Sequence, residues 1–226
     1  NSQFSKFKIN VRPKLINTGY IKLDHIRKKI KSSKKNKKEK YILIAPGYSY
    51  AFKQYNMYQN IEKIIEKILI QTSEKIIYRP HPLDLTFKGD IKIITKIINK
   101  FKNNKNFSYD FSTSYLKSFI NSKLLVTDLS STAYTYSFAT ERPVIFFSKN
   151  EKKLKKDYFS KLNYFKDRNK IGLVSENTND LIKILKNKTI TNSNIQKNII
   201  NLRKNRIEFF ESAVKRTASE INNIRK

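Results

Sequence analysis

The chain contains no cysteine and no tryptophan, and its 226 residues include only four glycines and five prolines. Without cysteine it can form neither a disulfide framework nor a thiolate metal site, a composition that suits a reducing compartment. No apolar run approaches the ~20 residues that a membrane-spanning helix needs, and no signal peptide is visible. These absences argue against a disulfide scaffold, a thiolate metal site and a membrane-spanning helix within this sequence.

Acidic residues are also scarce, since 18 Asp and Glu stand against 48 Lys and Arg and give a formal net charge of +30. Such a balance is typical of proteins that contact nucleic acid or an anionic membrane surface. The lysines are spread throughout a chain crowded with Asn and Ile, so the drift of an AT-rich genome explains much of this charge. What remains favours anionic donors and an acidic lipid surface.

The stretch from Asn121 to Ser148 organises the rest of the chain. Short apolar runs predict two buried strands around a helix, in the order Leu124–Val126, Ala133–Thr140 and Val144–Phe147. The turn before the helix is rich in polar side chains, namely Asp128, Ser130, Ser131 and Thr132. A helix N-terminus lined with hydroxyls suits a phosphate, but Ser and Thr also cap helices with no ligand. The pattern alone leaves both readings open.

A second motif is RPHP at residues 79–82, which follows the apolar strand Lys75–Tyr78. Two prolines make this loop rigid. The loop carries an arginine, whose fork of donors matches phosphate oxygens. It also carries a histidine, which can donate a hydrogen bond or a proton near neutral pH. Ligands of open α/β sheets bind at the carboxyl ends of the strands. We therefore expect Arg79, His81, Ser130 and Ser131 to share one edge of a parallel sheet.

Together, RPHP at 79–82 and TDLSSTAYTYSFATERPVIFF at 127–147 resemble the CDP-glycerol glycerophosphotransferase family. TGYIKLD at 18–24 is similar to the family's TGYPRxD segment, and YILIAPGYS at 41–49 to its ILYAPTW strand and loop. The resemblance spans roughly Asn17 to Leu185. It implies the two-domain GT-B architecture and an enzyme that builds teichoic-acid-like polymers from a CDP-activated donor.

The resemblance also implies roles for individual residues. It assigns catalysis to His81 and donor-phosphate binding to Ser130 and Ser131. From the chemistry of their side chains we add Arg79 beside the histidine and Thr132 as a further donor. Three other side chains have two readings each: Asp128 orients its loop or binds a metal, Glu141 reaches a ribose or forms a surface salt bridge, and Tyr48 contacts nucleotide or acceptor or only packs. We favour loop orientation for Asp128 and predict no metal and no cofactor.

The alternation of apolar strands and amphipathic helices predicts a doubly wound, Rossmann-like α/β domain, the C-terminal half of a GT-B architecture. The remaining predicted strands are 41–45, 107–110 and 171–174, and the remaining helices are 57–71, 91–101, 114–120, 178–185 capped by Thr178, and one or two within 195–224. We predict a loop for the lysine run 28–40, and the alternative is a polybasic patch that binds anionic lipid. We also predict a mobile loop over the site for the basic, aromatic segment 149–170, rather than a single-strand nucleic-acid site.

The predicted divisions are residues 1–16 as a linker or tail from a missing N-terminal domain, 17–190 as the donor-binding domain and 191–226 as a helical segment. The family's Trp-His-Gly-Thr motif is absent, so we expect either a fragment of a longer protein or a nucleotide binder without full catalysis.

The expected reaction transfers glycerol phosphate, or a similar polyol phosphate or sugar, to a growing cell-surface polymer. The acceptor is a polyol phosphate or saccharide, free or lipid-linked, and the expected location is cytoplasmic, on the inner face of a bacterial plasma membrane. We expect no specific nucleic-acid partner. The alternatives are a CMP- or CDP-sugar transferase of capsule synthesis, similar to polysialyl- or Kdo-transferases, and a nonenzymatic nucleotide- or nucleic-acid-binding module.

Overall fold

The computed structural model of the chain describes residues 15–33, 40–51, 53–86, 88–159, 162–187, 190 and 193–224. Within these residues six strands form one sheet in the order β3-β2-β1-β4-β5-β6, and every neighbouring pair is parallel. The strands are β1 (Tyr41–Ile44), β2 (Lys75–Tyr78), β3 (Phe107–Tyr109), β4 (Ser122–Thr127), β5 (Val144–Phe147) and β6 (Gly172–Ser175). The predicted doubly wound sheet is confirmed.

The strands are short because their apolar runs are short, and helices cover both faces of the sheet. Strands buried on both faces read as continuous aliphatic runs rather than as alternating patterns. In β1, Ile42 and Ile44 point into one core and Leu43 into the other, and all three are fully buried. The strand order reverses between β1 and β4, which is the position where such folds bind ligands.

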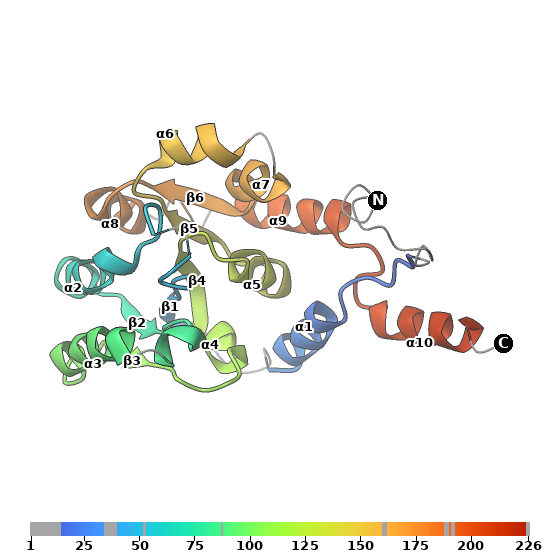
Figure 1. Ribbon diagram of the computed structural model, residues 1–226, viewed down its shortest axis with the longest axis horizontal. Helices are drawn as coiled ribbons and strands as arrows, with labels where there is room; N and C mark the ends of the chain where they lie inside the picture. The colour runs from blue at the N-terminus through green and yellow to red at the C-terminus, as the bar shows by residue number, and fades with distance from the viewer. Residues whose placement is uncertain are drawn as a thin grey trace.

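One face of the sheet is covered by α2 (Ile61–Gln71), α3 (Lys88–Phe101) and α8 (Thr178–Lys186) (Figure 1). The opposite face carries α1 (Ile21–Ser33), α4 (Leu116–Asn121), α5 (Thr132–Thr140) and α9 (Ser193–Arg206). A short 3-10 turn, η2 (Tyr58–Asn60), leads into α2, and another, η3 (Pro82–Leu85), precedes α3. The helix at 178–185 is confirmed, but its N-cap is wrong: the side chain of Asn177, not that of Thr178, accepts the N–H of Asp180.

The segment 149–170 is helical over most of its length, so the predicted mobile loop is wrong. It contains α6 (Glu151–Leu154), the π-helical η4 (Lys155–Phe159) and α7 (Asn163–Ile171), while residues 160–161 lie outside the described part. The guanidinium of Arg168, 1% exposed, pairs with both carboxylate oxygens of Glu151 at 2.6 and 2.8 Å. This ion pair between α6 and α7 holds the segment together, which no local pattern could indicate.

The lysine run is likewise structured where it is described. Residues 28–33 belong to α1, so the loop prediction is wrong there, and residues 34–39 lie outside the described part. The predicted linker at 1–16 also lies outside it, apart from Leu15 and Ile16.

Two helices follow residue 190, in agreement with the predicted pattern: α9 and α10 (Ala213–Ile224). α9 contributes Ile199 and Leu202 to the same core as α5, and α10 lies beside α1. The carboxylate of Asp24 in α1 accepts the N–H groups of Glu211 and Ala213 at 2.7 and 2.8 Å. The boundary at residue 190 stays a prediction.

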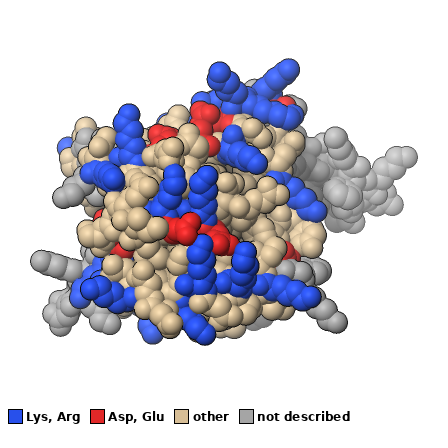
Figure 2. Space-filling view, turned by 90° about the vertical axis from the view of Figure 1, so that its left-hand side faces the viewer, with Lys and Arg blue, Asp and Glu red and all other residues tan. Residues whose placement is uncertain are grey.

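Basic side chains are distributed over the face that carries α2, α3 and α8. Figure 2 shows Lys and Arg around a central group of acidic residues on this side of the molecule. Part of the positive charge is locally paired, since Lys100 contacts both Glu62 and Glu66 at 2.8 Å. In the part of the chain that is described, no helix combines the length and apolar character needed to cross a membrane.

Candidate functional site

The carboxyl ends of β1, β2 and β4 meet at the point where the strand order reverses, and a cavity of about 310 Å³ opens there. Several predicted side chains line it together with others that the motifs did not single out. The lining residues that matter for the argument are Lys22, Arg79, His81, Thr113, Tyr115 and Thr132. The cavity therefore brings together the end of β2, the start of α5, the start of α1 and the loop after β3.

His81 lies just after β2, between two prolines, and lines this cavity. Its Nδ1 accepts the N–H of Leu83 at 3.3 Å. A neutral imidazole with an accepting Nδ1 carries its proton on Nε2, so that nitrogen is the one able to donate to a ligand. The ring lies 5.6 Å from that of Tyr48, at an interplanar angle of 40°. Tyr48 thus supports the histidine from the loop after β1.

Arg79 is 7% exposed, and its guanidinium is already paired. It contacts Oδ2 of Asp110 at 2.7 Å and donates to the carbonyl oxygen of Ser112 at 2.6 Å. The motif predicted a free fork for a phosphate, whereas the structure shows a side chain that fixes the loop carrying Thr113 and Tyr115. We therefore treat Arg79 as a positioning residue, and its part in catalysis stays a prediction.

The N-terminus of α5 presents the predicted hydroxyls. Thr132 lines the cavity, Ser131 is exposed, and Oγ of Ser130 accepts the N–H of Thr132 at 3.3 Å. The side chain of Ser131, at the N-cap position, makes no capping hydrogen bond. The hydroxyl of Ser131 is thus not used to cap its own helix, and it lies where the positive end of the helix dipole favours an anion.

Asp128 is buried beneath this turn and holds two other segments. Its Oδ1 accepts the N–H of Gly47 at 2.8 Å, and its Oδ2 accepts that of Met57 at 2.9 Å. Burial raises the pKa of Asp128, and the two N–H groups oppose that shift. A Cβ at Gly47 would lie 2.8 Å from Oδ1 of Asp128, so only glycine allows the loop to approach this closely. Among the described residues, no cluster of three or more acidic or histidine side chains could hold a metal.

Glu141 lies away from the cavity. It follows the C-terminal end of α5, whereas Ser130 and Ser131 precede the N-terminal end. Its Oε1 contacts Arg27 at 2.5 Å and Arg203 at 2.9 Å, and its side chain is 13% exposed. These contacts differ from both sequence readings, because the carboxylate forms a largely buried ion pair at the opposite end of the helix from the site. We therefore leave Glu141 out of the candidate site.

Lys22 is one of the lining residues that the sequence reasoning missed, together with Thr113 and Tyr115. It lies in α1, and its Nζ is 5.2 Å from the centroid of the Tyr115 ring. Its hydrogen bond with the Tyr115 side chain raises the pKa of Lys22. The signal was present, because Lys22 occupies the place of the arginine in the TGYPRxD segment that TGYIKLD resembles.

The parallel sheet, with a histidine loop and a hydroxyl-lined helix N-terminus at its switch point, defines an α/β domain of the Rossmann-like type found in GT-B enzymes. The family model described as CDP-Glycerol:Poly(glycerophosphate) glycerophosphotransferase matches residues 10–221. The chain belongs to this family.

Individual proteins resemble the chain in sequence or in fold. The chain is 32% identical over 133 residues to the minor teichoic acid biosynthesis protein GgaB of Bacillus subtilis strain 168. The matched stretch covers 58% of this chain and 13% of GgaB. The solved wall teichoic acid polymerase TagF superposes with a TM-score of 0.53 at 19% identity, over 86% of this chain and 45% of TagF. A complex of Staphylococcus aureus MnaA with UDP gives a TM-score of 0.50 at 13% identity, over 80% of this chain and 46% of MnaA.

The two solved structures show the shared fold. The chain spans less than half the length of TagF and about an eighth of GgaB. The family match does not favour the capsule sugar transferase or the nucleic-acid-binding module.

Proposed function

We propose that this chain is the donor-binding part of a transferase that moves glycerol phosphate, or a closely related polyol phosphate, from a CDP-activated donor to a growing teichoic-acid-type polymer. The observation that carries the proposal is one cavity at the switch point of the sheet that joins His81 to the N-terminus of α5. Membership of the glycerophosphotransferase family supports the choice of donor.

In the proposed reaction, an acceptor hydroxyl oxygen attacks the phosphorus that carries the polyol. A new P–O bond forms while the bond to CMP breaks, and CMP leaves with the electron pair. The acceptor's proton passes to a base that we assign to the partner domain expected from the family architecture. Negative charge grows on the CMP phosphate, and fixed donors at that position lower the barrier.

The donors we assign to that charge come from two loops and two helices, α5 and α1. His81 would donate through Nε2, because its Nδ1 is engaged by Leu83. Ser130, Ser131 and the amino end of α5 would bind the diphosphate. Lys22 adds a cation on the same cavity wall, and it need not change protonation state during the reaction.

We further propose that the protein works at an anionic membrane surface, where a lipid-linked acceptor would be present. The support is the net charge of +30, since each basic residue near an anionic leaflet contributes about 1 kcal/mol of attraction.

Calorimetric titration with CDP, CMP, UDP and GDP at physiological salt tests the donor assignment. We expect cytidine-selective binding by the wild type. The double variant Ser130→Ala/Ser131→Ala should weaken CDP binding by roughly tenfold or more, since a hydrogen bond to a charged group contributes about 1.5–3 kcal/mol.

The matched control is Ser32→Ala/Ser33→Ala, a pair of adjacent serines whose hydroxyls both donate to the carbonyl oxygen of Lys29 within α1. This control should bind CDP as the wild type does. Equal affinity for all four nucleotides, or equal CDP binding by the two double variants, would refute the assignment.

A further inference from the structure

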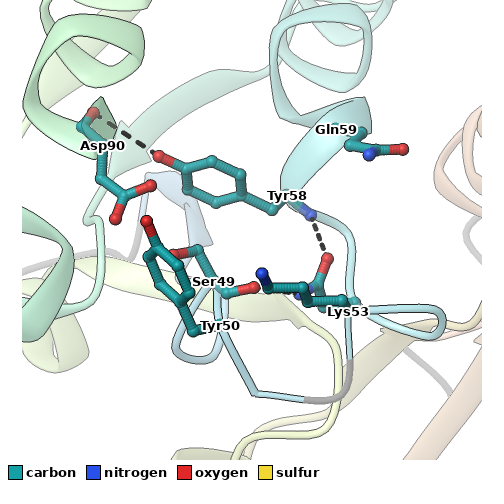
Figure 3. Close-up of a pocket in the computed structure, with 7 residues that line it drawn as sticks. Ser49, Tyr50, Lys53, Tyr58, Gln59 and Asp90 are labelled. Carbon is teal, nitrogen blue, oxygen red and sulfur yellow. Dashed lines mark hydrogen bonds between the residues drawn. The ribbon is translucent and has the colours of Figure 1, made fainter.

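A second cavity, of about 240 Å³, lies between the loop after β1 and the first turn of α3 (Figure 3). Its wall is formed chiefly by Ser49, Tyr50, Lys53, Tyr58, Gln59 and Asp90. The proposed donor reaction uses none of these side chains. We therefore consider this cavity as a separate binding site.

The wall of this cavity contains a buried carboxylate with one unpaired oxygen. Asp90 is 5% exposed, and its Oδ2 has no hydrogen-bond partner. Figure 3 shows this carboxylate turned toward the Tyr50 side of the cavity. Asp90 lies in the first turn of α3, where a carboxylate interacts well with the helix dipole. That position explains the charge but not the unpaired oxygen, and buried polar atoms normally have a partner.

Asp84 lies behind this wall and fixes Ser49. It is fully buried, and its Oδ1 accepts both the N–H of Ser49 at 3.2 Å and the hydroxyl of Ser49 at 2.7 Å. Burial raises the pKa of Asp84, and its Oδ2 also lacks a partner. Because the hydroxyl proton of Ser49 is donated to Asp84, its oxygen can only accept at the cavity wall. A fitting ligand must bring hydrogen-bond donors.

The rim of the cavity has the opposite character. Lys53 is exposed, and its Nζ lies 4.5 Å from the centroid of the Tyr50 ring, which is itself 49% exposed. An ammonium at the rim suits a phosphate outside the cavity, and the half-exposed ring of Tyr50 suits packing against the C–H groups of a polyol or sugar. A bare metal ion fits less well, because Lys53 would repel it and no three-ligand cluster exists among the described residues.

The second cavity is connected to the proposed catalytic histidine by a row of aromatic rings. Tyr50 lies 5.6 Å from Tyr48, and Tyr48 lies 5.6 Å from His81, measured between ring centroids. A ligand beside Tyr50 is therefore two ring spacings from His81. A ligand that runs from Tyr50 past Tyr48 would reach His81.

We propose that the cavity walled by Tyr50, Lys53 and Asp90 binds the hydroxyl-bearing end of the acceptor chain, with Asp90 accepting one hydroxyl and Lys53 contacting the first phosphodiester. A polyol end has at least two hydroxyls, so one held by Asp90 leaves another to react. This inference rests on the proposed transferase function. Asp90 binds and orients the acceptor here and does not serve as the base.

The probe for the experiment is glycerophosphoglycerol, two glycerols joined by one phosphodiester, and its binding is followed by amide chemical shifts in two-dimensional NMR. We expect shifts at Tyr50 and Asp90 in the wild type. The variant Asp90→Asn should weaken binding by roughly tenfold, the effect of losing one hydrogen bond to a charged group. Lys53→Ala should weaken binding of the probe but not of plain glycerol.

The matched control is Glu62→Gln, a carboxylate-to-amide change on α2 in a residue paired with Lys100 outside the cavity. Because Asp90 lies in the first turn of α3, the exposed Lys53→Ala variant keeps the test valid if Asp90→Asn unfolds. Probe affinity equal in the wild type, Asp90→Asn and Lys53→Ala would overturn the inference. Displacement of the probe from Asp90 by magnesium ions would also overturn the inference.

A parallel CDP titration separates this inference from the proposed function. CDP binding without probe binding dependent on Asp90 would overturn only the acceptor site. Probe binding dependent on Asp90 in a folded protein that binds no cytidine nucleotide would overturn only the donor assignment.

Discussion

At the scale of single residues, the pair of Arg79 and Asp110 decides how the loop after β3 is held against the donor cavity. Desolvation raises the pKa of Asp110, but hydrogen bonds from Ser112 and Ser118 and the charge of Arg79 outweigh it and hold the pKa below its usual range. The carboxylate therefore stabilises the folded state in its ionised form. The loop that it fixes carries Thr113 and Tyr115, which line the cavity.

The prediction concerns Asp110→Asn, which replaces the titrating carboxylate by an amide. Because the folded-state pKa lies below the unfolded value of about 3.9, the stabilisation is present above that pH and is lost as pH falls through the folded-state pKa. The wild type should exceed the variant in free energy of unfolding at pH 6, and the difference should shrink below about pH 4. Urea denaturation from pH 6 to pH 3 measures it, and parallel curves for the two proteins would contradict it.

At the scale of elements, the loop between β1 and α2 depends on the close approach of Gly47 to Asp128. In Gly47→Ala the new Cβ would lie 2.8 Å from Oδ1 of Asp128, so the loop must move and the 2.8 Å hydrogen bond is lost. We expect a loss of roughly 1–3 kcal/mol of stability, the cost of an unsatisfied buried polar group. CDP binding should weaken too, because the same loop supports His81 through Tyr48.

The comparison variant is Asn177→Ala, which removes the N-cap of α8 and should cost about 1 kcal/mol of stability. Since α8 takes no part in either cavity, this variant should leave CDP affinity unchanged. Urea denaturation and CDP titration on both variants separate a loss of stability from a loss of binding. Weakened CDP binding in both variants to the same extent would mean that Gly47 acts only through stability.

The elements themselves were largely predictable because their signals are local. The runs at β1, β2 and β5 are short, aliphatic and bounded by turn residues, and a parallel sheet then brings their polar ends together. The helices at 149–170 could not be predicted, since they depend on the buried pair of Glu151 and Arg168. The partner of Arg79 was equally hidden, because Asp110 follows a different strand. Pairings between distant segments are set by tertiary packing, so the sequence motifs alone cannot predict them.

At the scale of the whole molecule, Glu141 joins three helices that are far apart in the sequence. It contacts Arg27 of α1 and Arg203 of α9 from the end of α5. The two guanidinium groups also donate to carbonyl oxygens at the end of α5, Arg27 to Ala139 and Arg203 to Phe138. All three side chains are largely buried, so the carboxylate compensates two cations that water cannot reach.

Glu141→Gln removes that compensation without a change of size. Breaking a buried ion pair costs about 3–5 kcal/mol when charge is left buried and unpaired. This applies most fully to Arg203, because Arg27 keeps its contact with Glu211 at 3.6 Å. For a chain of this length, we expect the melting temperature to fall by roughly 6–15 °C. The control is Glu74→Gln, which removes a more exposed pair with Lys123 and should cost about 1 kcal/mol or less. Thermal unfolding followed by circular dichroism measures both variants.

CDP affinity should be unchanged in Glu141→Gln below its melting temperature, because Glu141 lies at the opposite end of α5 from the proposed donor site. Equal melting temperatures for the two variants would show that α1, α5 and α9 are held together by their apolar contacts alone.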